Sequence, residues 1–140
     1  MYSGPVDGVR LHRLGKRLID LARTVTTDEA DPAMTAAEVA VLEDVFKHPG
    51  SAVSDIRART GFAQSHVSSS VARLRARGLL CTGPDPDDRR RTLVTVAEPA
   101  RRAIMRRASR PADRAVADAV GERHARRVEE LLEELAELLL

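Results

Sequence analysis

Residues 51–80 read SAVSDIRARTGFAQSHVSSSVARLRARGLL and contain two short apolar patterns separated by a glycine. The first pattern predicts a short helix that Ser51 caps and Gly61 ends, because serine accepts a first-turn N–H and glycine suits the turn after a helix. The second repeats apolar residues in steps of four and three, the spacing of one helix face. Two short helices joined across such a turn form a helix-turn-helix. The apolar residues are Val53 and Ile56 in the first helix, and Val67, Val71 and Leu74 in the second.

The second helix of this motif, over residues 64–77, has a small, polar and basic outward face. A major groove about 12 Å wide admits a helix whose leading face lacks bulk, and serine, histidine and arginine hydrogen-bond base edges or phosphates. The alternative is an ordinary polar helix face. The turn before this helix and the charged hairpin predicted after it favour DNA readout over that alternative. For His66, a solvent-exposed or cap-proximal role is an equal alternative. The face carries Ser65, Ser69, Ala72, Arg73 and Ala76, with His66 and Ser68 on its flanks.

A charged loop follows the second helix. The β-rich runs Leu79–Thr82 and Leu93–Val96 enclose the segment GPDPDDRRR at residues 83–91. This arrangement predicts two antiparallel strands joined by a charged turn. We call residues 83–92 the wing.

Helices are also predicted on both sides of this region. Val6–Thr26 has an apolar stripe and Asp7 as its N-cap, and Ala36–Lys47 starts with the capping-box pair Thr35 and Glu38. After Pro99 the chain is predicted to be helical to its end, with interruptions at Pro111 and Gly121. The apolar positions are Leu11, Leu14, Leu18, Leu21 and Val25 in the first helix, Val39, Leu42, Val45 and Phe46 in the second, and Val128, Leu131, Leu132, Leu135, Leu138 and Leu139 in the last.

The apolar stripes of the first and last predicted helices need other apolar surfaces to cover them. Packing within one chain is the alternative, but a chain of 140 residues with 2% aromatic content favours shared burial in a dimer.

Charge is distributed unevenly along the chain. The formal net charge is only +2, yet residues 57–107 hold twelve arginines against four acidic residues, while residues 128–140 hold five glutamates and no base. A basic segment of this kind is typical of a polyanion-binding surface, and the acidic tail would face away from the polyanion. A solvated, ion-paired surface is the alternative. A GC-rich genome also raises arginine over lysine, so the clustering carries more weight than the count.

Several classes of function are disfavoured. The chain has no glycine-rich phosphate loop, no nucleophile elbow and no evident carboxylate pair, so we expect no enzyme, and its four scattered histidines predict no metal site or cofactor. The lone Cys81 lies in an apolar strand run, which predicts a buried thiol rather than a redox sensor. The apolar runs are too short for a membrane span and no signal peptide is apparent, so we expect a cytoplasmic protein.

Taken together, these segments resemble the MarR family of winged-helix transcription regulators over nearly the whole chain. Met34–Gly50 resembles the family's second helix and its Pro-Gly exit, Gly61–Leu80 its recognition helix and first wing strand, and Asp85–Val96 its wing. Two departures are Ala63, where the family usually has a Ser or Thr cap, and Glu98-Pro99, which replaces a glycine-containing turn.

The resemblance implies a homodimer with recognition helices in successive major grooves and wings in the minor grooves. It implies that Asp88 orients Arg90 in an Asp-x-Arg arrangement, and that a small anionic or aromatic effector binds between the dimer helices and the DNA-binding lobe. Repressor and activator action both remain open. A winged-helix module that binds protein or RNA is the alternative function.

We therefore expect a mainly α fold with a small two-stranded β wing, in one domain spanning residues 1–140. Residues 6–30 and 99–140 would form dimerisation helices, and residues 35–97 the DNA-binding lobe. The expected partner is double-stranded DNA. The predicted DNA-binding residues are Ser65, His66, Ser68, Ser69, Arg73, Arg75, Arg77, Asp88, Arg89 and Arg90, and the predicted dimerisation residues are Leu11, Leu14, Leu18, Val128, Leu131, Leu135 and Leu138.

Overall fold

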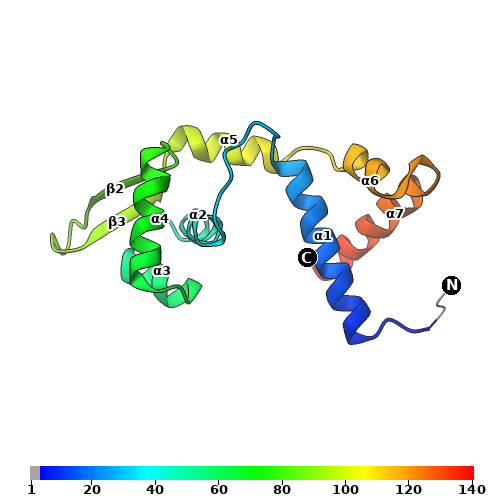
Figure 1. The fold of residues 1–140 in the computed structure, drawn as a ribbon, viewed down its shortest axis with the longest axis horizontal. Helices are drawn as coiled ribbons and strands as arrows, with labels where there is room; N and C mark the ends of the chain where they lie inside the picture. The colour runs from blue at the N-terminus through cyan, green and yellow to red at the C-terminus, as the bar shows by residue number, and fades with distance from the viewer. Residues whose placement is uncertain (1–3) are drawn as a thin grey trace. The chain divides into compact units, whose positions relative to one another are not determined.

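The structure, a computed structural model, describes residues 4–140 and divides into two compact units (Figure 1). The central unit is Pro32–Met105. The terminal unit combines the chain up to Asp31 with the chain from Arg106 onward. No helix within residues 4–140 is both long and apolar enough to cross a membrane.

The central unit consists of helices packed on a small sheet. Its elements in chain order are α2 (Ala36–Lys47), β1 (Ser51–Ala52), α3 (Val53–Thr60), α4 (Gln64–Ala76), β2 (Leu80–Pro84), β3 (Thr92–Val96) and the greater part of α5 (Glu98–Ala108). The strand order is β1-β3-β2 and both pairings are antiparallel. Leu80 pairs with Val96 at one end of the β2–β3 hairpin, and Pro84 pairs with Thr92 at the other. The hairpin therefore projects its turn, residues 85–91, beyond the sheet.

The core of this unit joins α2, α3 and α4 to the sheet. It is built from aliphatic side chains alone, as expected from a chain with 2% aromatic residues. Fully buried aliphatic side chains hold the two helices of the helix-turn-helix in a fixed relation to the hairpin. The buried cluster is Val41, Val45, Ile56, Val67, Val71, Leu74, Leu80 and Val94.

The terminal unit contains α1 (Gly8–Thr26), α6 (Asp113–Val120) and α7 (Glu122–Leu139). Helix α1 buries none of its side chains, and only Val116 in α6 and Ala125 in α7 are buried. Gly121, at a φ of 82°, makes the turn between α6 and α7. A single copy of this unit therefore has almost no core of its own.

Ion pairs tie the end of α5 to the loop that follows α1. The Arg107 guanidinium bonds to Asp31 and lies 3.0 Å from Asp28. Arg110 donates to Asp28 at 2.8 Å. The Arg110 bond is the main cause of a lowered pKa at Asp28, and the Arg107 bond is the main cause of a lowered pKa at Asp31.

Most predicted helix ends are confirmed. Asp7 caps α1 by accepting the Arg10 N–H at 2.8 Å. The capping box of Thr35 and Glu38 is present, and Gly61 ends α3 at a φ of 76°. The C-terminal helices are interrupted at Pro111 and Gly121 as predicted.

The prediction for Ser51 is wrong. Ser51 pairs with Val94 in strand β1, which makes the sheet three-stranded rather than two-stranded. Ala52 is the N-cap of α3, and its N–H donates to the Asp55 carboxylate at 3.1 Å. The Ser51 hydroxyl does not cap α3, because it donates to the His48 carbonyl at 2.6 Å.

The expected burial of α2 and of Cys81 also needs correction. In α2, Val45 is buried as predicted, but Val39, Leu42 and Phe46 are only partly buried. Glu38 and Val41 are buried instead. Cys81 is exposed. Side chains alternate along a strand, so the inward position of Leu80 turns Cys81 to the opposite face.

Candidate nucleic-acid interface

Helix α4 divides cleanly into a buried and an exposed side. Val67, Ser70, Val71 and Leu74 are buried, and the remaining positions of the helix are exposed. The exposed group includes the predicted contacts Ser65, His66, Ser68 and Ser69. Ala63 is the N-cap and supplies no side-chain hydrogen bond, so this end of α4 lacks a side-chain cap.

Two predicted contacts on α4 are engaged by a carboxylate of α2. Arg73 Nε donates to Glu38 Oε1 at 2.6 Å, and Arg77 Nη1 lies 3.6 Å from Glu38 Oε2. The Glu38 side chain is 2% exposed, whereas those of Arg73 and Arg77 are 53% and 35% exposed. The carboxylate is therefore inside the unit, and the two guanidinium groups cover it.

Glu38 is held in its charged form. Burial alone would raise the pKa of the Glu38 carboxyl, but the Thr35 N–H at 3.2 Å and the charges of Arg73 and Arg77 together lower its pKa below the ordinary value. One carboxylate thus completes the capping box of α2 and binds the last turns of α4.

Other arginines of the basic segment also have intramolecular partners. Arg59 makes a bidentate ion pair with Asp44, at 2.8 and 2.9 Å, and donates to the Ser51 hydroxyl. Arg91 pairs with Asp55 at 3.1 Å, and Arg101 lies 4.9 Å from the centre of the Phe46 ring. These three side chains contribute to the structure of the central unit.

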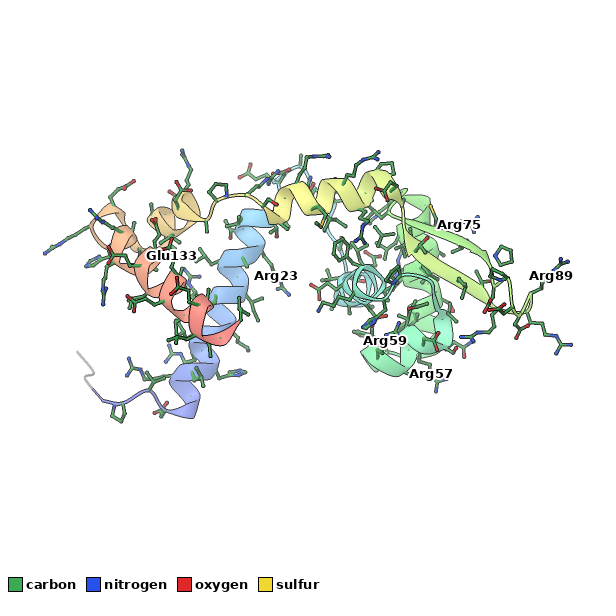
Figure 2. All side chains as sticks on the ribbon, turned by 180° about the vertical axis from the view of Figure 1, so that it is seen from behind. Arg23, Arg57, Arg59, Arg75, Arg89 and Glu133 are labelled. Carbon is green, nitrogen blue, oxygen red and sulfur yellow. The ribbon has the colours of Figure 1, made fainter. Side chains whose placement is uncertain are left out.

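A second group of arginines in the central unit has no carboxylate partner among residues 4–140. Figure 2 shows Arg57 on α3 and Arg89 at the tip of the hairpin pointing outward from the unit. Side chains in this group are exposed, so their positive charge is available to an external anion. The group consists of Arg57, Arg75, Arg89 and Arg90.

The turn of the wing is held by its own aspartates. Asp88 Oδ1 accepts the Arg90 backbone N–H at 3.1 Å, and Asp85 Oδ1 accepts the Asp87 N–H at 2.9 Å. The Arg91 N–H donates to the Asp88 carbonyl and the Asp85 N–H to the Arg91 carbonyl. These bonds bend the loop and leave the side chains of Arg89 and Arg90 outside it.

Comparison with known proteins identifies the fold of this chain. Residues 34–100 match the family model described as a winged helix DNA-binding domain. The solved structure of the multiple antibiotic resistance repressor, MarR, is 16% identical with a TM-score of 0.66 and covers 100% of both chains. This chain is a winged-helix protein with the MarR fold.

Two further relatives are regulators. The HTH-type transcriptional repressor NicR of Pseudomonas putida is 32% identical over 68 residues, which make up 49% of this chain and 43% of NicR. The match therefore spans less than half of that repressor. The structure of the transcriptional repressor CouR bound to a 23-mer DNA duplex is 22% identical with a TM-score of 0.55, and covers 94% of this chain and 92% of CouR.

In the winged-helix unit, the structure brings together some of the predicted site residues and separates others. The polar residues of α4 share one exposed side, whereas Arg73 and Arg77 turn toward Glu38. Sequence reasoning omitted Arg57 from the site, although the first helix of such a motif lies against the DNA backbone. It also could not recognise Glu38 as a buried partner of α4, because capping boxes usually lie at the surface of a helix end.

The residues predicted for dimerisation lie on the terminal helices of the MarR fold. Leu11 and Leu14 on α1 are 61% and 45% exposed, and Leu131, Leu135 and Leu138 on α7 are 40%, 41% and 81% exposed. Leu18 and Val128 are partly buried. Within residues 4–140, no group of three or more histidine, cysteine or acidic side chains is arranged to hold a metal ion.

Proposed function

We propose that the chain is a transcriptional repressor that binds a pseudo-palindromic operator as a homodimer, with α4 in the major groove and the wing in the minor groove. The observation that supports this function best is the exposed polar side of α4, flanked by arginines that no carboxylate within residues 4–140 neutralises. Its relative NicR is a transcriptional repressor, and its structural neighbour CouR is bound to a DNA duplex.

Each group of side chains would have its own role. Ser65, His66, Ser68 and Ser69 would contact base edges or phosphates at the floor and walls of the major groove. Arg75 and Arg57 would bind phosphates on either side of α4, and Arg89 and Arg90 would enter the minor groove. Asp88 would shape the turn that presents Arg90. The sequence predicts Arg73 and Arg77 as direct contacts, but their ion pairs with Glu38 favour a structural role for both.

The terminal helices would form the interface between two copies. Their leucines are exposed in one chain, and burying such faces is the main favourable term in association. Charge supports the same arrangement. Arg13, Lys16, Arg17 and Arg23 on α1, and Glu129, Glu133, Glu134 and Glu137 on α7, form no ion pair within residues 4–140, so the basic α1 of one copy complements the acidic α7 of the other.

Three further properties belong to this proposal. The chain would act by binding alone, without catalysis, and would work in the cytoplasm. A small anionic or aromatic effector would change the separation of the two recognition helices. Activation in place of repression would be revealed by the position of the operator relative to the promoter.

Selection of bound genomic fragments followed by footprinting tests this function. We expect two protected half-sites with centres about 34–36 Å apart, the separation of successive major grooves. Ser69→Glu should abolish protection, because it places a negative charge on the outward side of α4, while Ser69→Ala at the same position removes only one hydrogen-bonding group and should weaken binding much less. Selection of RNA or of a protein, with no protected duplex, would favour the alternative interaction module.

A further inference from the structure

Glu38 occupies an unusual position for an acidic residue in a DNA-binding unit. It lies at the start of α2, and its side chain is 2% exposed. Its partners are Arg73 on α4 and Arg77, one turn later at the C-cap of that helix. Residues four apart share one side of a helix, so both guanidinium groups reach the same carboxylate. The carboxylate therefore contacts the recognition helix at two points.

This contact restrains α4 in a way that apolar packing does not. The buried residues of α4 are aliphatic apart from Ser70, and non-directional packing of such side chains tolerates small rotations and shifts. A buried carboxylate has fixed hydrogen-bond directions, and leaving it unpaired is costly. Rotation of α4 about its axis would break the 2.6 Å contact between Arg73 and Glu38.

We propose that Glu38 is a positioning residue that sets the angle of the recognition helix on DNA and withholds Arg73 and Arg77 from the phosphates. The inference rests on the proposed function and deepens it. Arg73 and Arg77 then belong to the scaffold of the lobe, and discrimination between sequences passes to Ser65, His66, Ser68 and Ser69. Sequence-independent attraction comes from Arg57, Arg75, Arg89 and Arg90.

The charge balance gives this role a distinctive consequence. Glu38→Gln keeps the size of the side chain and an oxygen that can accept the Thr35 N–H, but removes the charge that holds both arginines. The released guanidinium groups are on an exposed helix and can bind phosphates. Loss of positioning lowers affinity for the operator, while the released charges raise affinity for any duplex.

The experiment compares wild type and Glu38→Gln on the selected operator and on an unrelated duplex, each over a range of salt concentrations. We expect the ratio of the two affinities to fall by at least about tenfold. Affinity for the unrelated duplex should rise, and the slope of log affinity against log salt should steepen by up to about 0.9 for each released arginine that meets a phosphate. A merely structural defect would weaken both duplexes together and leave the slope unchanged, and that result would overturn the inference.

Glu98→Gln is the matched control. It removes the same charge from the same unit at an exposed side chain whose partner, Arg102, is 3.9 Å away on α5. We expect it to leave the affinity ratio unchanged. A Glu98→Gln protein that reproduces the loss of specificity would show that total charge, not positioning, causes the effect.

Arg73→Gln keeps the inference testable if Glu38→Gln does not fold, because Arg73 is half exposed and Arg77 remains beside Glu38. We expect a loss of preference spread over the whole half-site, and no further loss in the Glu38→Gln, Arg73→Gln double variant. A preference relaxed at one base pair alone would identify Arg73 as a base reader and overturn the inference. If wild type binds no duplex at all, the proposed function fails and the inference fails with it.

Discussion

The Asp88 carboxylate accepts the backbone N–H of Arg90 at 3.1 Å, and the Arg90 guanidinium has no carboxylate partner among residues 4–140. Asp88 therefore orients Arg90 through the shape of the turn and not through an ion pair. In the proposed complex with DNA, Asp88 could act through the shape of the turn or through its negative charge.

Substitutions at the wing should reveal which role dominates. Asp88→Asn keeps an acceptor for the turn and removes a negative charge, so we expect operator affinity equal to or higher than wild type. Asp88→Ala loses the acceptor and should bind more weakly, in the direction of Arg90→Ala.

The loss with Arg90→Ala should be largest for operators with A·T-rich flanks, whose narrow minor groove attracts arginine. Titrations on operators differing only in their flanks would measure this. Tighter binding by Asp88→Ala, with Arg90→Ala unchanged, would show that the wing does not read the minor groove.

The salt dependence of binding should reflect the unpaired arginines and not the whole basic segment. The four unpaired arginines described in the central unit of each chain give eight in a dimer, for a slope of about −7 in log affinity against log salt if each neutralises one phosphate. Arg57→Gln should reduce this slope by about 2, one phosphate in each half-site. Arg59→Gln is the matched comparison, because Arg59 is already paired with Asp44 and its loss should leave the slope unchanged. Equal slopes for wild type and Arg57→Gln would remove Arg57 from the interface.

The terminal helices should hold two copies together. Sedimentation of the full chain at micromolar concentration should give about twice the chain mass of 15.3 kDa. Leu135→Asp, which places a charge on the exposed apolar side of α7, should shift the chain to a monomer, whereas Glu130→Gln, at a carboxylate already paired with Arg126 and Arg127 on the same helix, should not. A soluble, folded monomer of the unsubstituted chain would remove both the interface and the spacing of the half-sites.

Ser70 should be a weak point in the core of the winged-helix unit. Its side chain is fully buried on α4, and its Oγ has no hydrogen-bond partner among residues 4–140. Burying an unsatisfied hydroxyl costs free energy, so Ser70→Ala should raise the free energy of unfolding by about 1 kcal/mol. Ser69→Ala on the exposed side is the control for the higher helix propensity of alanine. It should change the free energy of unfolding by less than about 0.5 kcal/mol. Urea midpoints at constant slope measure both, and a Ser70→Ala protein no more stable than Ser69→Ala would indicate that the hydroxyl is satisfied in solution.

Acid should weaken the ion pairs of the terminal unit that join Asp28 and Asp31 to Arg107 and Arg110. The pKa values of Asp28 and Asp31 are lowered by their bonds to Arg110 and Arg107, respectively, so as pH falls the unfolded chain takes up these protons first. Their contribution is present at neutral pH and is lost from about pH 4 downward, through the lowered values. Urea midpoints at pH 7, 4 and 3 should decline less steeply for Arg107→Gln than for wild type. Parallel declines would show that Arg107 does not set the acid sensitivity of Asp31.

Much of the fold was determined by the sequence on its own, because the signals are local. A capping pair three residues apart, a glycine after a helix and an apolar residue every three or four positions act within one or two turns of chain, which is why α2, α3 and α4 begin or end near the predicted residues. Two short β-rich runs on either side of a charged loop likewise located the β2–β3 hairpin. The exposed polar side of α4 follows from the same periodicity, since burying Val67, Val71 and Leu74 turns Ser65, Ser68 and Ser69 outward.

Only the tertiary structure decided which charges are available for binding. Glu38 and Arg73 are 35 residues apart, and no local pattern links them. Arg57 and Arg59 differ by two positions in the sequence, yet one points outward and the other is bound by Asp44 of α2. Ser51 joins a strand because Val94, more than forty residues away, supplies the pairing edge. An ion pair or a strand pairing depends on which surfaces packing brings within a few ångströms, and that distance is set by the assembled core and not by neighbours along the chain.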